Sequence, residues 1–132
     1  AGLPTAVARF HARLRQADAL LIASPEYNYS ITGVLKNALD WASRRGSGES
    51  SPLDGKTAAI VGAGGMHGTL RAQLHLREIL AHHEVYVLRQ SLRLARGYTH
   101  FDDNLNLTDQ SSRARLEKLL LALQDWTLRL NK

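Results

Sequence analysis

The chain has 132 residues, of which 44% are hydrophobic and 22% are charged, a balance typical of one globular domain and unlike that of a disordered chain. It contains no cysteine, which excludes a disulfide scaffold, a thiolate metal site and a cysteine nucleophile. The formal net charge of +5 comes mainly from 13 arginines spread along the chain, and no nucleic-acid-binding motif accompanies them. No apolar run approaches the length of a membrane span, so we predict a cytoplasmic protein that binds neither nucleic acid nor membrane.

The first two predicted elements are a helix and a buried strand. A helix is predicted over 5–16, where Val7, Phe10 and Leu14 recur on one side at helical spacing. The strand is predicted over 19–23, which reads Ala-Leu-Leu-Ile-Ala. An apolar run without alternation is typical of a parallel strand that is covered on both faces.

A short polar and aromatic turn follows this strand. Residues 25–29 read Pro-Glu-Tyr-Asn-Tyr and are too polar to be ordinary core, and Pro25 fits where a strand stops pairing. Thr32 or Ser30 can then cap a helix that extends to about Ser43. By spacing alone the turn could equally be a plain surface loop, although open α/β sheets bind ligands at the carboxyl ends of their strands.

The same order of strand, turn and helix occurs again farther along the chain. A flexible loop rich in glycine and serine at 44–55 leads to a predicted strand at 57–61. A glycine-rich turn at 62–68 and a helix at 69–77 follow.

The last part of the chain is predicted to hold a third strand at 84–88, a mostly irregular segment at 89–106 and a final helix capped by Ser111 or Ser112. Alternating strands and helices predict a three-layer α/β fold with a parallel sheet. The inward-facing side chains of the final helix are predicted to be Leu116, Leu119, Leu120, Leu123, Trp126 and Leu130.

Other catalytic motifs do not occur in the sequence. The glycine-rich turn lacks the third glycine of a dinucleotide-binding fingerprint, and neither a P-loop lysine nor a GxSxG elbow is found. The six histidines form no HExxH pair, so no metal site is predicted, and His82 and His83 are interpreted as charge at a helix end or plain surface.

Two segments carry a family resemblance. Residues 24–43 read SPEYNYSITGVLKNALDWAS, and residues 52–77 combine a PLDGK lead-in, the glycine-rich turn and an Arg-Ala-Gln helix start. Together they resemble the NADPH-dependent FMN reductases and NAD(P)H quinone reductases of flavodoxin-like fold. This resemblance covers the chain from its first helix to its last. It implies a doubly wound parallel sheet of five strands, of which the third, fourth and fifth are found here.

The first two strands of that sheet, with the phosphate-binding loop and helix between them, are not found in the sequence. We therefore expect residues 1–132 to form a single flavodoxin-like domain that corresponds to the C-terminal two-thirds of the complete domain. The strand at 19–23 would then have an apolar edge without a partner, which folded proteins avoid. Either a longer polypeptide or a partner chain would supply the missing strand.

The resemblance implies an oxidoreductase that passes hydride from NADPH or NADH through FMN to a quinone, flavin, azo compound or similar acceptor. No catalytic side chain is expected, because the reactivity belongs to the cofactor. A homodimer or homotetramer is implied, with the helix that carries Trp41 in the subunit contact. Tyr29 and His67 are implied to face the substrate. The implied FMN-binding residues are Pro25, Glu26, Tyr27, Asn28, Ser30, Gly64, Gly65, Met66 and Gly68.

Some of these assignments have alternatives. Tyr27 could be a half-buried packing residue, Asn28 could brace the turn, and Tyr29 could be exposed to solvent. Thr69 stands where the resembled family usually has a second glycine, so we expect its restricted backbone to alter the approach of the cofactor. The alternative for the whole chain is a truncated flavodoxin-like module that binds no flavin and acts through oligomerisation. A flavodoxin-type electron carrier fits poorly, because such carriers are usually acidic.

Overall fold

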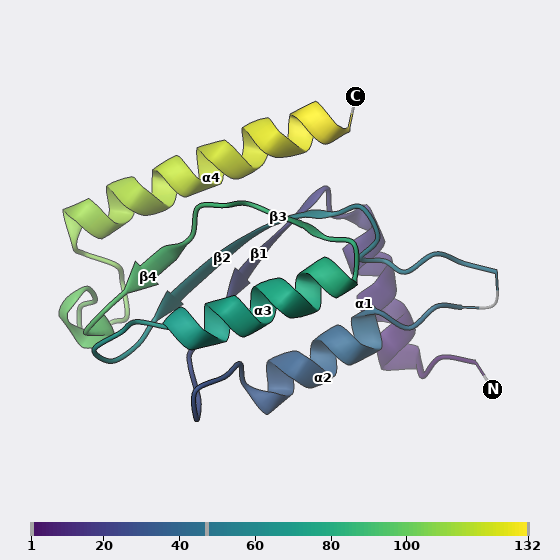
Figure 1. The fold of residues 1–132 in the computed structure, drawn as a ribbon, viewed down its shortest axis with the longest axis horizontal. Helices are drawn as coiled ribbons and strands as arrows, with labels where there is room; N and C mark the ends of the chain where they lie inside the picture. The colour runs from purple at the N-terminus through teal and green to yellow at the C-terminus, as the bar shows by residue number, and fades with distance from the viewer. Residues whose placement is uncertain (1, 47, 132) are drawn as a thin grey trace.

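The computed structural model describes residues 2–46 and 48–131, which form a parallel sheet between two layers of helices (Figure 1). One layer contains three helices and the other contains the long C-terminal helix alone. The α/β fold class with a parallel sheet is therefore confirmed. The elements are α1 (Thr5–Gln16), β1 (Ala19–Ala23), α2 (Gly33–Ala42), β2 (Thr57–Ala63), α3 (Leu70–His82), β3 (Tyr86–Val87), β4 (Leu92–Leu94), the 3-10 helix η1 (Gly97–Thr99) and α4 (Gln110–Leu130).

Strand β2 is the centre of the sheet and pairs in parallel with every other described strand. On one side it pairs with β1 along five residues, from Ala19 opposite Thr57 to Ala23 opposite Val61. On the other side it has two short partners in succession. Its first two residues pair with β3, and its last three pair with β4.

Strand β4 corrects the prediction of an irregular segment at 89–106. Leu92 and Leu94 are buried and Arg93 between them is exposed. The predicted strand at 84–88 is also shorter than expected, because only Tyr86 and Val87 pair with β2. A three-residue strand has too few positions for alternation to be recognised in the sequence.

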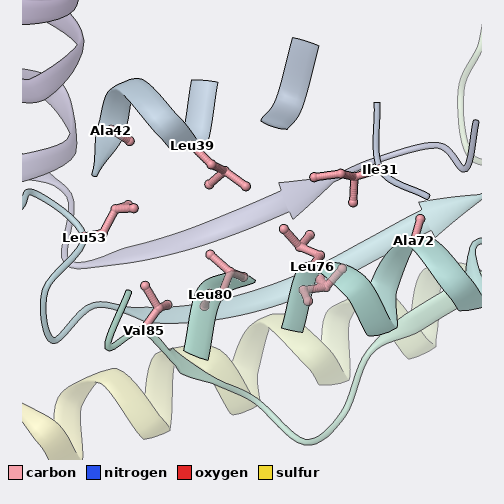
Figure 2. Packing of buried hydrophobic residues seen from close by; sticks show 10 residues of the cluster. Ile31, Leu39, Ala42, Leu53, Ala72, Leu76, Leu80 and Val85 are labelled. Carbon is pink, nitrogen blue, oxygen red and sulfur yellow. The ribbon is translucent and has the colours of Figure 1, made fainter. Parts of the chain in front are cut away.

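The alternation of side chains along β2 creates two hydrophobic cores. Ala58 and Ile60 face α1, α2 and α3, whereas Ala59 faces α4. The first core is the larger one, and Figure 2 shows its side chains converging between α2, α3 and the sheet. Its buried members are Ile31, Leu39, Ala42, Leu53, Ala58, Ile60, Ala72, Leu76, Leu80 and Val85.

Both long-range packing and local caps fix the helices. The hydroxyl groups of Thr57 on β2 and Thr127 on α4 lie 2.6 Å apart in the second layer, and both residues are buried. The Thr32 side chain caps α2 by accepting the N–H of Leu35 at 3.0 Å. Of the two caps that the sequence offered, Thr32 or Ser30, the structure has Thr32.

The cap of α4 differs from the prediction of Ser111 or Ser112. Asp109 is the N-cap, and its carboxylate accepts the N–H of Ser112 at 2.7 Å. Ser112 is buried inside the first turn and hydrogen-bonds His100 Nδ1 at 2.9 Å. The helix therefore begins two to three residues earlier than the sequence indicated.

The outer side of α4 and the edge of β1 remain uncovered in the part of the chain that the structure describes. Leu119 and Leu123 are buried as predicted, but Leu120, Trp126 and Leu130 are about 40% exposed, so the predicted inward stripe was too wide. Leu21 on β1 is 47% exposed, and no described strand pairs with the outer edge of β1.

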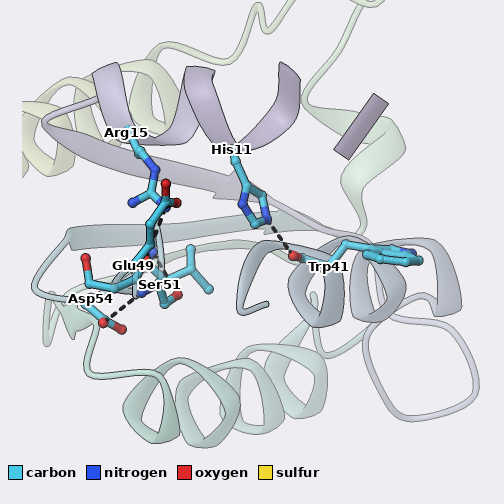
Figure 3. A network of polar contacts seen from close by, with 8 residues as sticks. His11, Arg15, Trp41, Glu49, Ser51 and Asp54 are labelled. Carbon is cyan, nitrogen blue, oxygen red and sulfur yellow. Dashed lines mark hydrogen bonds and ion pairs between the residues drawn. The ribbon is translucent and has the colours of Figure 1, made fainter. Parts of the chain in front are cut away.

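The last turn of α2 and the segment between α2 and β2 are tied to α1 by polar contacts (Figure 3). The Arg15 guanidinium donates to the Glu49 carboxylate at 2.7 Å, and the ring of His11 hydrogen-bonds the carbonyl of Trp41 at 2.8 Å. The N–H of Ser51 donates to Asp54 at 3.0 Å. Among the described helices, none is long and apolar enough to cross a membrane.

Candidate functional site

The turns that follow β1 and β2 lie next to each other at the carboxyl edge of the sheet. Ala23 and Val61 are paired, and the N–H of Ser24 continues the ladder by donating to the carbonyl of Val61 at 3.1 Å. The chain leaves both strands at this point. Adjacent carboxyl ends of parallel strands are the usual ligand-binding place of an open α/β sheet.

The turn after β1 is a tight hairpin. Tyr27 and Ser30 exchange two backbone hydrogen bonds of 3.0 Å, which leaves Asn28 and Tyr29 at the tip. Both tip residues have positive φ, 47° and 70°, as the two-residue turn of this hand requires. Asparagine tolerates this conformation, whereas for tyrosine it is strained, and such strain is found mainly at functional sites. Within the described chain the tip N–H groups have no acceptor, and Tyr27 and Tyr29 are more than 60% exposed.

Three contacts with α3 hold this hairpin. The Glu26 carboxylate accepts the N–H groups of Arg71 at 2.9 Å and Ala72 at 3.1 Å. The Arg71 guanidinium carbon lies 4.1 Å from the centre of the Tyr29 ring, which is the geometry of a cation–π contact. Ser30 Oγ lies 2.9 Å from His75 Nδ1. The strained tip is therefore supported by its neighbours and not by its own sequence preference.

Glu26 is held in its charged form. Partial burial by itself would raise the pKa of its carboxyl, but the hydrogen bonds from Ala72 N–H, Arg71 N–H and the Arg71 guanidinium together lower that pKa below its ordinary value. The side chain is only 13% exposed, and one of its oxygens lies 3.4 Å from the Arg71 guanidinium. The carboxylate thus occupies the positive amino end of α3.

The turn after β2 is a second hairpin. Gly68 donates its N–H to the carbonyl of Gly65 at 3.1 Å, so that Met66 and His67 form the tip. Gly68 has a φ of 61°, which glycine adopts without strain. Met66 is 77% exposed, and in the described part of the chain the N–H groups of Met66 and His67 have no acceptor. The two hairpins therefore present the same feature, an exposed tip with free N–H groups.

Close packing explains one of the glycines that lead into the second hairpin. A Cβ atom on Gly62 would lie 2.5 Å from the carbonyl oxygen of Ser24 and 2.9 Å from Thr69 Cγ2, and still closer to Thr69 Oγ1. A Cβ atom on Gly65 would meet nothing within 4 Å. Gly62 is thus needed for packing, whereas Gly65 faces open space.

Thr69 lies in the interior, directly before α3. Its side chain is fully buried, fills the space beside Gly62 and accepts a hydrogen bond from Gln73 Nε2 at 3.0 Å. The side chain of Thr69 therefore faces the interior, and the effect of its restricted backbone on the approach of a cofactor stays a prediction.

The segment that follows β4 fastens the second hairpin from the other side. Arg96 and Gly97 donate their N–H groups to the carbonyls of Gly65 and Gly64, each at 2.8 Å. Gly64 in turn donates to the carbonyl of Leu94 at 3.0 Å. We call residues 94–97 the wall of the second hairpin. No motif in the sequence indicates this wall, because its contacts are with residues about 30 positions away.

Two open hollows lie along this edge of the sheet. One, of about 420 Å³, is mainly apolar and lies at the ends of β1, β2 and β4, where Pro25, Gly62 and Leu94 line it. The other, of about 600 Å³, is lined by Gly64, Gly65 and the segment after β4, including Tyr98 and Asp102. Ala63 and Phe101 line both, so the hollows adjoin. The edge is open and is not filled with packed side chains.

The structure places the predicted cofactor and substrate residues on the two hairpins or directly before them, but it gives them different roles. The tips carry Asn28, Tyr29, Met66 and His67, whereas the side chains of Glu26 and Ser30 are engaged with α3. Gly68 is buried against Arg93 Cβ. Among the residues described, no three carboxylate or imidazole groups come together as metal ligands.

Comparison with known proteins identifies relatives of this arrangement. A family model described as NADPH-dependent FMN reductase matches residues 1–99. The chain is 47% identical over 131 residues to the NAD(P)H-dependent FMN reductase of Pseudomonas aeruginosa, with 98% of this chain and 69% of that protein covered. It is 40% identical over 130 residues to the NADPH:quinone oxidoreductase of Arabidopsis thaliana, covering 96% of this chain and 64% of that protein.

A solved structure shows the same fold. The flavoenzyme NAD(P)H:(acceptor) oxidoreductase FerB of Paracoccus denitrificans superposes with a TM-score of 0.81 at 29% identity. The match covers 96% of this chain and 69% of FerB. The chain thus spans about two thirds of the length of the proteins it matches.

Proposed function

Because the chain belongs to the NADPH-dependent FMN reductase family, we propose that the whole protein is a flavoenzyme that oxidises NADPH or NADH and passes the electrons through FMN to a small-molecule acceptor. The flavodoxin-like fold and the oxidoreductase class predicted from the sequence are confirmed. The residues that bind the cofactor, the acceptor and the assembly remain proposals.

The pair of hairpins is the observation that carries this proposal. Their exposed tips provide four N–H groups without acceptors in the described chain, from Asn28, Tyr29, Met66 and His67. Backbone N–H groups on such tips can stabilise negative charge on a flat ring, and Gly65 leaves room for its close approach. FMN, when bound, supplies the hydride chemistry, and the protein supplies binding, orientation and electrostatics.

The phosphate of FMN needs ligands from outside the described hairpins. Helix α3 begins at this edge, but the N–H groups of Arg71 and Ala72 already donate to Glu26, so its amino end is occupied. We propose that residues 1–132 are the C-terminal two-thirds of a flavodoxin-like domain, and that a further strand and loop beside β1 bring the phosphate ligands. The unpaired edge of β1 and the exposed leucines of α4 support this proposal.

Quinones, flavins and azo compounds are the proposed acceptors, with Tyr29 and His67 facing them from the two tips. A homodimer or homotetramer is proposed because apolar side chains are exposed on α2 and α3. Val34 is 83% exposed, Leu74 is 54% exposed and Trp41 is 37% exposed. We propose the cytoplasm as the location, since a chain without cysteine has no need of an oxidising compartment.

Flavin titration tests the proposal. Purified protein is expected to quench FMN fluorescence and to oxidise NADPH when a quinone is added. Riboflavin has the ring of FMN without the phosphate, so a comparison of the two affinities separates the contribution of the ring from that of the phosphate. The 132-residue chain should bind riboflavin and FMN with similar affinity, whereas protein that includes the completing strand should prefer FMN.

The competing proposal is a truncated module that binds no flavin and acts through oligomerisation. The uncovered apolar side of α4 favours it. A chain that binds neither flavin but elutes as an oligomer in size-exclusion chromatography would support the module and contradict the enzyme.

A further inference from the structure

We propose that Glu26 is a positioning residue, whose carboxylate couples the two hairpins and thereby sets the gap between their tips. The evidence for the coupling is the set of contacts that Glu26 makes. Only the identity of the molecule that enters the gap, a flavin ring, rests on the proposed function.

The carboxylate connects the two hairpins through the amino end of α3. Glu26 lies two residues before the first tip, and it accepts the N–H groups of Arg71 and Ala72 in the first turn of α3. That helix begins at Leu70, directly after the second hairpin. A displacement of the Glu26 carboxylate would therefore move the first tip relative to the second.

The rest of the connection is rigid. Between the second hairpin and α3 lies Thr69, which is fully buried, packs against Gly62 and accepts a hydrogen bond from Gln73. On the other side of the site, Ser24 is buried and continues the ladder with β2. A small change at the carboxylate is thus not absorbed by flexible neighbours.

The other contacts between the first hairpin and α3 are less able to fix it. Tyr29 and His75 are largely exposed, so their contacts with Arg71 and Ser30 compete with water. The Glu26 side chain is only 13% exposed and makes charge-assisted hydrogen bonds, which are stronger than neutral ones. Glu26 is the contact on which the placement of the tip depends.

The charge of Glu26 has a second effect at the same place. It offsets the positive amino end of α3 and the Arg71 guanidinium, so the field at the gap is less positive than these groups alone would make it. A ring in the gap gains negative charge on reduction. Loss of the carboxylate should therefore favour the reduced ring and raise its reduction potential.

Hydrogen exchange read by mass spectrometry tests the coupling without any cofactor. Glu26→Gln and Glu26→Ala are compared with wild type and with Glu49→Gln, which removes a different arginine-paired carboxylate far from the hairpins. Both Glu26 variants should exchange at least about tenfold faster in the peptides that contain 26–30 and 70–73, with alanine exceeding glutamine. Exchange in the peptide of β2 should be the same in all variants and in wild type. In E49Q, exchange in every hairpin peptide should equal that of wild type. Unchanged exchange at 26–30 in E26A would overturn the proposal.

The second arm uses FMN as the probe. In E26Q the affinity for FMN should fall by about tenfold or more, since small misplacements of binding groups have effects of this size. The potential of bound FMN should rise and its visible circular dichroism should change, whereas E49Q should match wild type in all three. Wild-type affinity and potential in E26Q would overturn the positioning role, even if E26A fails to fold. Wild type that binds no FMN, with exchange as expected, would contradict the proposed function and still support the coupling.

Discussion

Replacement of Gly62 by alanine tests whether the two hairpins are packed as closely as the structure indicates. The added methyl group would lie 2.5 Å from the carbonyl oxygen of Ser24 and 2.9 Å from Thr69 Cγ2. Neither neighbour can rotate away, because one is backbone and the other is a fully buried side chain. Gly65→Ala is the matched control, since its methyl group would meet nothing within 4 Å.

The two substitutions should differ clearly in stability. Alanine would favour an extended strand over glycine by about 0.5–1 kcal/mol in the absence of contacts. Forcing an extra methyl group into a filled space costs about 1–3 kcal/mol and sometimes more. We expect Gly62→Ala to lose about 2 kcal/mol net and to melt about 8 °C lower, whereas Gly65→Ala should stay within about 0.5 kcal/mol of wild type.

Urea unfolding followed by the fluorescence of the two tryptophans measures both changes. The double substitution Gly62→Ala with Thr69→Ala should recover only part of the loss caused by Gly62→Ala, because the contact with the Ser24 carbonyl remains. Equal stability of the Gly62 and Gly65 variants would refute the close packing. In the same samples Gly65→Ala should weaken FMN binding despite its normal stability, since the methyl group would occupy the open approach to the second hairpin.

Three further outcomes follow from single contacts. Thr32→Ala should destabilise the protein by about 1 kcal/mol in urea unfolding, because the N–H of Leu35 loses its cap, whereas Ser111→Ala on the exposed side of α4 should have no effect. Thr127→Val should cost about 1–3 kcal/mol by leaving the buried Thr57 hydroxyl without a partner. The double variant Thr57→Val with Thr127→Val should lose less stability than Thr127→Val alone. A larger loss of stability in the double variant would contradict the paired hydroxyl groups. Because the pKa of Glu26 is lowered in the folded protein, the stability that its charge contributes is present above the ordinary carboxyl pKa and is lost as pH falls through the folded-state pKa. The stability difference between wild type and E26Q should therefore shrink on acidification, and a difference that grows would have the wrong sign.

The sequence was sufficient where a local pattern and a tertiary contact agree. The apolar run at 19–23 and the helical spacing at 5–16 matched their elements to the residue. The apolar side of α1 packs on the first core, but β1 is only partly buried, so the expected cover on both of its faces is not found in the described chain. Helix α3 continues five residues beyond the predicted end at Arg77, since Leu80 extends its buried face. Strand β4 could not be recognised, because three residues paired only with the end of β2 give no periodic signal.

The two turns of the candidate site lie side by side for a similar reason, but their internal contacts could not be predicted from the sequence. Two turns that follow neighbouring parallel strands must meet at one edge, and the sequence contains both turns. The partner of Glu26 lies 45 residues away, and the wall at 94–97 reaches the second hairpin through backbone N–H groups that any sequence possesses. Such contacts depend on the tertiary fold, and no particular residue type in the sequence indicates them.

On one flank of β2, the strands β3 and β4 pair with different ends of the strand. This arrangement has a consequence for how such proteins diversify. The two residues of β3 anchor the sheet, and the three of β4 lead into the wall beside the second hairpin. Between them Arg89 and Gln90 are exposed and pair with no strand. Insertions at that interruption should be tolerated, and they would reshape one side of the candidate site without disturbing the hairpins. Homologues that accept bulkier molecules are expected to vary in length there.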